Sequence, residues 1–161
     1  MKELLLQKRS KHKITFPSLW TNTVCSHPLA IESEICGVEG VQNAVLRRSI
    51  YEFNLELEKA DLHFVQRILY FREMDHELLA ENELDYCVLS CCDRPFSMNQ
   101  NEIEDFKFIQ FNELATFMVE NETTPWFKLI YQSGLLEQWW RELLQDDLKS
   151  VTVDPSIRLL K

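Results

Sequence analysis

Glycine and proline are scarce in this sequence, and long apolar runs are missing from it. Only 3 Gly and 5 Pro occur among 161 residues, which excludes a collagen-like or low-complexity chain. No run approaches the ~18 apolar residues of a membrane-spanning helix, and Met1 leads into Leu4 without the layout of a signal peptide. We therefore expect no membrane partner and one domain over residues 1–161, with a C-terminal tail at 146–161.

Basic charge and paired cysteines are also in short supply. The 17 Lys and Arg residues stand against 26 Asp and Glu, and the net charge of −9 disfavours binding to nucleic acid. The five cysteines are an odd number and contain no CxxC pair, so we expect neither a secreted disulfide framework nor a closed structural zinc site. Reduced thiols favour a cytoplasmic protein, with a peroxisomal location left open.

What the sequence does contain is strand patterns that alternate with helical ones. Helical spacing runs from Gly40 to Leu55, with Asn54 ending the helix in the left-handed conformation. A long amphipathic helix is predicted from Thr124 through Leu144. Strands are predicted at residues 4–6, 19–26, 62–71, 82–92 and 106–111, and a short helix at 112–119. This order indicates an α/β or α+β sandwich, a sheet with helices on both faces.

Glu81 and Glu83, in the stretch ENELDY, should share one face of a strand, because side chains alternate along a strand. Two carboxylates on one face repel each other unless a cation or a shared proton holds them. The stretch is therefore either a solvated strand face or a site for a hard metal or for acid/base chemistry.

Cys25 and His27 also share a face if the chain there is extended, although each alone is typical of a structural side chain. The loop QKRSKHK before them, residues 7–13, holds four cations, which suit either solvent or an anion site. Cations close to a thiol favour its thiolate form. The segment is therefore either a solvated loop followed by two structural side chains, or an anion site formed by the loop together with Cys25 and His27.

Glu52 follows Arg48 by four residues near the end of the first predicted helix. This is the spacing of an ordinary helical ion pair, worth a few tenths of a kcal/mol. The alternative is an acid that faces inward and contacts a metal-bound phosphate.

Five stretches, taken in order, resemble the type I isopentenyl-diphosphate isomerases, which adopt the Nudix fold. They are LLLQKRSKHKITFPSLWTNTVCSHPL, GVQNAVLRRSIYEFNL, ENELDY, NEIEDFKFI and TPWFK. The resemblance implies a Nudix-like α/β/α sandwich with a mixed sheet. It also implies an isomerase of isoprenoid biosynthesis that interconverts isopentenyl and dimethylallyl diphosphates by a 1,3-allylic proton transfer. A divalent metal is implied as well, Mg²⁺ before Mn²⁺ or Zn²⁺, and we expect a monomer whose partner is this small-molecule substrate.

The resemblance also implies roles for individual residues. Cys25 and Glu83 match the two groups that exchange protons with opposite faces of the substrate. The expected metal ligands are His27, Glu81, Glu83 and Glu52. The expected substrate contacts are Arg9, Lys13 and Ser26, which match positions that hold the diphosphate, and Trp126, which offers an aromatic face to a carbocation.

Two features depart from the family's pattern. The family begins upstream with a strand, a lysine and two histidine ligands, and His12, His63 and His76 do not match those ligands. A tyrosine that the family places before the first glutamate falls on Phe71, and Tyr70 should face the other way in a strand. A truncated or diverged non-catalytic Nudix-like domain, acting as a binding or regulatory protein, therefore stays open. A Nudix hydrolase is disfavoured because the helix lacks that class's paired glutamates.

Overall fold

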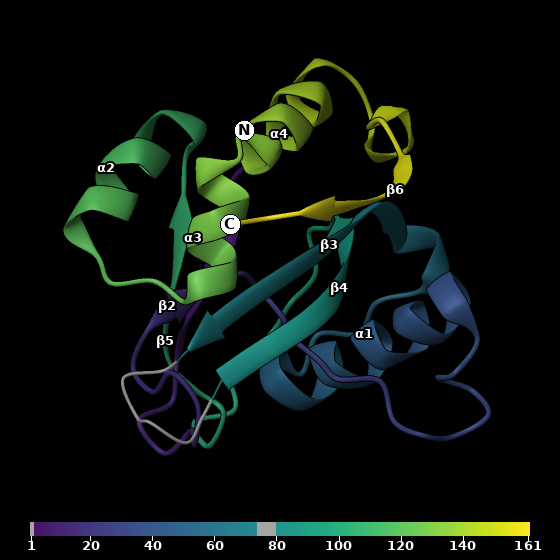
Figure 1. The fold of residues 1–161 in the computed structure, drawn as a ribbon, viewed down its shortest axis with the longest axis horizontal. Coiled ribbons are helices and arrows are strands. Elements are labelled where there is room, and N and C mark those ends of the chain that lie inside the picture. Colours follow the sequence, from purple (N-terminus) through teal and green to yellow (C-terminus); the bar gives the residue numbers. More distant parts are fainter. Residues whose placement is uncertain (1, 74–79) are drawn as a thin grey trace.

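The computed structural model describes residues 2–73 and 80–161, which form six strands and four α-helices (Figure 1). The strands are β1 (Leu4–Arg9), β2 (Trp20–Thr21), β3 (Leu62–Glu73), β4 (Ala80–Ser90), β5 (Ile103–Ile109) and β6 (Asp154–Leu159). The helices are α1 (Gly37–Phe53), α2 (Leu114–Glu120), α3 (Pro125–Gln132) and α4 (Leu135–Gln145). Short 3₁₀ helices lie at Lys59–Asp61, Phe111–Glu113 and Leu148–Ser150. Within these ranges, no helix is both long and apolar enough to cross a membrane.

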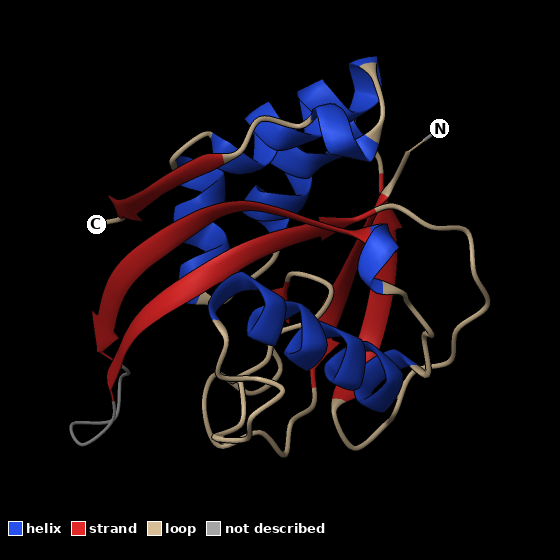
Figure 2. Cartoon of the chain, turned by 90° about the vertical axis from the view of Figure 1, so that its right-hand side faces the viewer, coloured by secondary structure: helices blue, strands red, loops and turns tan. Residues whose placement is uncertain are grey.

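The strands form two three-stranded sheets. In the first, β1 lies between β2 and β5 and is antiparallel to both. In the second, β3 pairs antiparallel with β4 and parallel with β6, so this sheet is mixed. Figure 2 shows the strands between two groups of helices, with α1 on one side and the C-terminal helices on the other. The predicted α/β/α sandwich with a mixed sheet is confirmed.

Helix α1 begins at Gly37, three residues before the predicted start, and ends as predicted. Asn54 adopts the left-handed conformation with φ 46°, and its amide donates to the carbonyl of Ile50 at 2.8 Å. Gly40 is needed for close packing, because a Cβ atom there would lie 2.4 Å from the carbonyl oxygen of Glu34. The sequence therefore holds α1 tightly against the segment that precedes it.

The C-terminal region differs from the prediction in two places. The single helix expected from Thr124 to Leu144 is interrupted, because Gly134 takes a φ of 79° and its amide bonds to the carbonyl of Tyr131. The segment that we assigned to a tail contains β6, whose residues are all exposed. The apolar alternation of β6 is limited to Ile157 and Leu159, which is too short a pattern to predict a strand.

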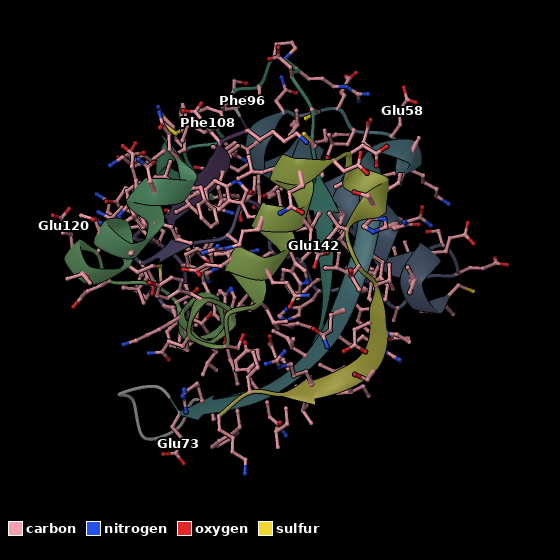
Figure 3. All side chains as sticks on the ribbon, turned by 90° about the horizontal axis from the view of Figure 1, so that it is seen from above. Glu58, Glu73, Phe96, Phe108, Glu120 and Glu142 are labelled. Atoms are coloured by element: carbon pink, nitrogen blue, oxygen red, sulfur yellow. The ribbon has the colours of Figure 1, made fainter. Side chains whose placement is uncertain are left out.

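The main core is formed by residues of both sheets and of the C-terminal helices. Its large members are Leu6, Ile68, Tyr70, Trp126, Phe127, Trp139 and Trp140. A smaller core lies under α1, where Phe53 meets Phe96 edge-on. Phe96 also contacts Phe108 of β5, with ring centroids 5.9 Å apart (Figure 3). The main core matters for function because it brings helix α3 against β3.

Candidate active site

Two acids lie side by side on β4, and one tyrosine of β3 bonds to both. Glu81 and Glu83 are two residues apart and project from the same face of the strand. The Tyr70 hydroxyl lies 3.0 Å from Oε2 of Glu81 and 3.0 Å from Oε2 of Glu83. The same-face carboxylate pair that the sequence predicts is therefore present, and a single O–H donor is shared between the two acids.

Tyr70, not Phe71, faces these acids, so the expectation that Tyr70 would face away was wrong. The strand register pairs Tyr70 with Glu83 and Phe71 with Asn82. Directly opposed residues of antiparallel strands project to the same face. Tyr70 is accordingly 1% exposed, whereas Phe71 lies on the outer face and is 51% exposed. The sequence analysis assigned Phe71 to the face of the acids, one residue away from Tyr70. The register between β3 and β4 decides which residues share a face, and spacing along one strand does not give it.

His27 reaches the acids from the chain that follows β2. The strand predicted at 19–26 is only two residues long, because pairing with β1 stops at Thr21. The chain beyond it is irregular and brings Nε2 of His27 to 2.9 Å from Oε1 of Glu83. The structure thus brings together three of the predicted metal ligands, His27, Glu81 and Glu83.

A third acid, Asp85, extends the pair to an acid row, Glu81–Glu83–Asp85, and the sequence analysis missed it. Burial first, then the charge of Glu83, raises the pKa of Asp85 to about 7, although His27 acts against this shift. Burial and the charges of the acid row also raise the pKa of Tyr70, so its hydroxyl remains a donor at neutral pH. The two-residue spacing in ENELDY was a signal that could have identified Asp85.

Cys25 packs against the main core, near enough to the acid row for these charges to act on its thiol. Burial is the largest cause that raises the pKa of Cys25 to about 12. Asp85 and Glu52 add to this shift, and Arg9 opposes it. Arg9 acts toward the thiolate, as expected of a nearby cation, but burial and the carboxylates outweigh the guanidinium. The thiol is therefore the favoured form of Cys25 in the chain without substrate.

Trp126, in the first turn of α3, brings an aromatic face to this cluster. Its ring centroid lies 6.4 Å from that of Tyr70, and Phe16 meets it edge-on at 5.6 Å. The guanidinium carbon of Arg9 lies 5.5 Å from the Trp126 ring. The N–H groups of Arg9 donate to the carbonyls of Phe16 and Thr15, at 3.1 and 2.8 Å. Two predicted substrate contacts, Arg9 and Trp126, are therefore neighbours.

Lys13 and Glu52 belong to a second polar cluster between β1 and α1. Arg48 pairs with Glu52 at 2.5 Å and with Glu102 at 2.9 Å, and Lys13 also pairs with Glu102. Gln7 donates to the second oxygen of Glu52 at 2.8 Å. Glu52 is both a helical ion-pair partner and an inward acid, since it is only 3% exposed. Its hydrogen bonds go to Arg48 and Gln7, so it lies in this cluster and not in the acid row.

Ser26 lies beside a cation that the sequence analysis did not single out. Nη2 of Arg47, on α1, lies 3.4 Å from Oγ of Ser26 and 3.2 Å from the carbonyl oxygen of His27. Glu34 bonds to the same guanidinium at 2.7 and 2.9 Å. The bond from Arg47 is the main reason why the pKa of Glu34 falls to about 2. The Ser26–His27 segment is thereby fastened to α1.

The donor types of this cluster fit a divalent cation, although the described residues are not arranged around one. No group of three or more His, Cys, Asp or Glu side chains in the described parts of the chain is placed to hold a metal ion. Glu83 bonds to His27 through one oxygen and to Tyr70 through the other, and Glu81 also bonds to Tyr70. An imidazole with carboxylates is still a donor set that Mg²⁺ or Mn²⁺ accepts. A further histidine, His76, lies outside the described residues.

This arrangement of sheets and helices is a Nudix fold. The chain is similar to the crystal structure of the Nudix-type protein DR0079 from Deinococcus radiodurans, with a TM-score of 0.54. The likeness covers 82% of this chain and 74% of that one at 17% sequence identity, which shows the fold alone. The predicted fold class is confirmed. No protein-family model matches the chain.

Curated proteins that are similar in sequence are isopentenyl-diphosphate delta-isomerases. The chain is 38% identical over 151 residues to the one from Gibberella zeae, covering 88% of this chain and 59% of that protein. It is 37% identical over 172 residues to the Aspergillus fumigatus protein, covering 96% and 61%, and 36% identical over 150 residues to that of Schizosaccharomyces pombe, covering 87% and 65%. The resemblance inferred from the motifs is confirmed, and the chain spans about three fifths of the length of these relatives.

Proposed function

We propose that this chain interconverts isopentenyl diphosphate and dimethylallyl diphosphate. One observation carries the proposal: Glu83 is held between His27 and Tyr70, and the ring of Tyr70 lies beside that of Trp126. The thiol of Cys25 lies within the field of the same acids. A held carboxyl group, a thiol and an aromatic face are what a proton shift along a hydrocarbon chain requires. The isomerases that are similar in sequence support the same reaction.

The reaction moves a double bond by one carbon, so one proton is added and another is removed. In the forward direction Glu83, as the carboxylic acid, donates a proton to the terminal methylene carbon of isopentenyl diphosphate, and Cys25, as the thiolate, accepts one from the allylic carbon. This leaves a Glu83 carboxylate and a Cys25 thiol, the forms from which the reverse reaction starts, and transfer of one proton from the thiol to the carboxylate through solvent restores the forms that the forward reaction needs. An unactivated alkene is a very weak base, and the donor must therefore be held in contact with it. Tyr70 holds Glu83 for this purpose.

Addition of the first proton places positive charge on a tertiary carbon. The faces of Trp126 and Tyr70 carry the negative part of an aromatic quadrupole and would stabilise that charge. Trp126 is only 5% exposed, so a cation held against its ring would be shielded from water. The Trp126 ring would stabilise the same carbocation in the forward and in the reverse reaction.

The diphosphate is proposed to lie against Arg9, Lys13 and Ser26, with Arg47 as a further cation beside Ser26. His27, Glu81 and Glu83 would hold a divalent metal, with Mg²⁺ best suited, and Glu52 would face a magnesium carried by the diphosphate. When bound, the metal would offset the negative charge of the acids and sharpen the acidity of the proton donor.

We also propose that the chain acts as a monomeric, single-domain cytoplasmic protein whose partner is the substrate alone. The net charge of −9 argues against a nucleic-acid partner. Gel filtration coupled to light scattering tests the monomer. A mass of twice the 19.2 kDa of the chain would contradict it.

Proton NMR tests the reaction directly. Isopentenyl diphosphate is mixed with the purified chain and MgCl₂, and its methylene signals should be replaced by the methyl and vinyl signals of dimethylallyl diphosphate. Excess chelator should stop the change. An unaltered spectrum after long incubation with Mg²⁺, Mn²⁺ and Zn²⁺ in turn would contradict the proposal.

A second candidate is a non-catalytic Nudix-like domain that binds a diphosphate. The arrangement of the acid row favours it, since the described side chains around Glu83 bond to one another and do not frame a metal ion. Calorimetry separates the two functions. Binding of isopentenyl diphosphate without conversion in the NMR experiment would support this second candidate.

A further inference from the structure

The side chain of Asn22 connects the two sides of the candidate site. Its Oδ1 accepts a hydrogen bond from Nε1 of Trp126 at 2.9 Å and another from the hydroxyl of Thr21 at 2.9 Å. Its Nδ2 donates to the carbonyl of Val24 at 2.7 Å. Val24 immediately precedes Cys25. One short side chain therefore fixes the orientation of the Trp126 ring and the backbone that carries the thiol.

The support beneath Asn22 is itself rigid. The hydroxyls of Thr21 and Thr124 lie 2.8 Å apart, and both residues are fully buried. The amide of Thr124 also donates to the carbonyl of Trp20 at 2.9 Å. Thr124 precedes helix α3 directly, so the start of that helix is joined to β2 by backbone and side-chain bonds. The bonds between Thr124 and β2 therefore hold Asn22 and helix α3 in a fixed relation to each other.

A purely local role for Asn22 would not need the bond to Trp126. A turn around Asn22 is satisfied by Thr21 and Val24 alone, whereas Trp126 lies 104 positions further along the chain. The indole N–H is the single polar group of a nearly buried ring, and a buried donor without a partner is costly. The acceptor at Asn22 therefore decides which way the ring faces.

We propose that Asn22 is a positioning residue, which sets the Trp126 ring and the Cys25 thiol relative to each other. Its effect on catalysis rests on the proposed isomerase function, but the positioning itself does not. Asn22→Ala removes all three bonds. Asn22→Asp keeps the oxygen that accepts from Trp126 and Thr21, and replaces the donor to Val24 by a second, charged oxygen. The two variants therefore separate two arms of the proposal, the action of Asn22 on the Trp126 ring and its action on the Cys25 thiol.

The arm toward the ring is tested without any substrate. Trp126→Phe identifies the indole N–H signal of Trp126 in a ¹⁵N correlation spectrum, because that signal disappears. In Asn22→Ala we expect this signal to shift and its exchange with water to rise by about fivefold or more, the factor that corresponds to one hydrogen bond. In Asn22→Asp it should stay protected. An unchanged indole signal in Asn22→Ala would overturn the proposal.

The arm toward the thiol is tested by alkylation, followed at Cys25 by peptide mass spectrometry. Both Asn22→Ala and Asn22→Asp should be alkylated at Cys25 about fivefold faster than the wild-type chain, since each loses the bond to Val24. The rate at Cys87, a partly buried thiol on β4, should not change and controls for general unfolding. Equal rates at Cys25 in all three proteins would overturn this arm. If Asn22→Ala does not fold, Asn22→Asp alone decides it.

Kinetics then tests the consequence for the reaction. Both variants should lower kcat and leave KM within about twofold, because the proposed diphosphate contacts are untouched. In a Trp126→Phe background, the difference in kcat between Asn22→Ala and Asn22→Asp should become smaller, since the bond to Trp126 is gone and only the bond from Thr21 still distinguishes them. A difference of undiminished size in this background overturns the action through the ring. If the wild-type chain shows no conversion at all, the proposed function fails, while the NMR and alkylation results still decide the positioning role.

Discussion

His27 and Glu83 hold each other across the site, with Nε2 and Oε1 2.9 Å apart. The other oxygen of Glu83 accepts the hydroxyl of Tyr70 at 3.0 Å. A metal ion that takes both His27 and Glu83 as ligands must replace existing hydrogen bonds, and the net gain on binding is reduced by their loss. The site is therefore organised before a metal binds, and the metal competes with the protein's own contacts.

This relationship predicts weak binding of divalent metal in the absence of substrate. Calorimetric titration with MnCl₂ or MgCl₂ should give an affinity far below the nanomolar range, and Glu83→Gln should remove the binding. His12→Gln, an exposed histidine elsewhere on the surface, is the matched control and should bind as the wild-type chain does. Nanomolar affinity in the wild-type chain would contradict this prediction.

Tyr70→Phe removes the hydroxyl that Glu81 and Glu83 share and keeps the volume of the ring. A hydrogen bond to a charged group contributes about 1.5–3 kcal/mol, so we expect kcat to fall by roughly 10- to 100-fold. Phe71→Leu, on the exposed outer face of the same strand, is the control and should retain activity. A Tyr70→Phe protein with unaltered kcat would show that the hydroxyl does not support the reaction.

Glu34 gives a prediction about acid stability. Its bond from Arg47 holds the pKa at about 2 in the folded chain, below its ordinary value of 4.5. The ion pair therefore stabilises the fold above pH ~4.5, and this contribution is lost as the pH falls from about 4.5 toward about 2. Glu34→Gln should be less stable than the wild-type chain at pH 7, with the gap narrowing to nothing near pH 2. Urea unfolding over this pH range measures it, with the exposed Glu32→Gln as control. A gap that stays constant with pH would contradict the assignment.

Gly40→Ala should destabilise the fold. The added Cβ would meet the carbonyl of Glu34 at 2.4 Å, and backbone on both sides would have to move. Such overpacking costs typically about 1–3 kcal/mol, despite the better helix propensity of alanine. Ile50→Ala, half-exposed on the same helix, should cost much less. Equal or greater stability of Gly40→Ala in urea unfolding would show that α1 is free to shift.

Much of this fold could be predicted from local pattern. The end of α1 at Asn54 and the strands β3 and β4 followed from periodicity and from one residue that tolerates the left-handed conformation. Strand β6 could not be predicted in this way, because its residues are exposed and it is defined by its pairing with β3. The break at Gly134 was visible as a glycine, yet apolar spacing on both sides continued through it.

The site could be predicted in its residue types and not in its contacts. The shared face of Glu81 and Glu83 followed from alternation along one strand, which sequence does encode. The position of Tyr70 depended on the register between two strands, and the raised pKa of Cys25 depended on burial and on Asp85. Both are tertiary properties, so neither follows from spacing alone.

Deuterium exchange tests the central claim, that Cys25 and Glu83 transfer the two protons. Isopentenyl diphosphate is incubated with the chain and Mg²⁺ in heavy water, and deuterium is followed by NMR at the allylic and methyl carbons. The account predicts incorporation at both carbons in the wild-type chain, and a loss of about 10²- to 10⁴-fold in Cys25→Ala and in Glu83→Gln, the usual share of one acid/base group. Cys36→Ala, which removes an exposed thiol, should exchange as the wild-type chain does. Exchange in Cys25→Ala at the wild-type rate would contradict the account.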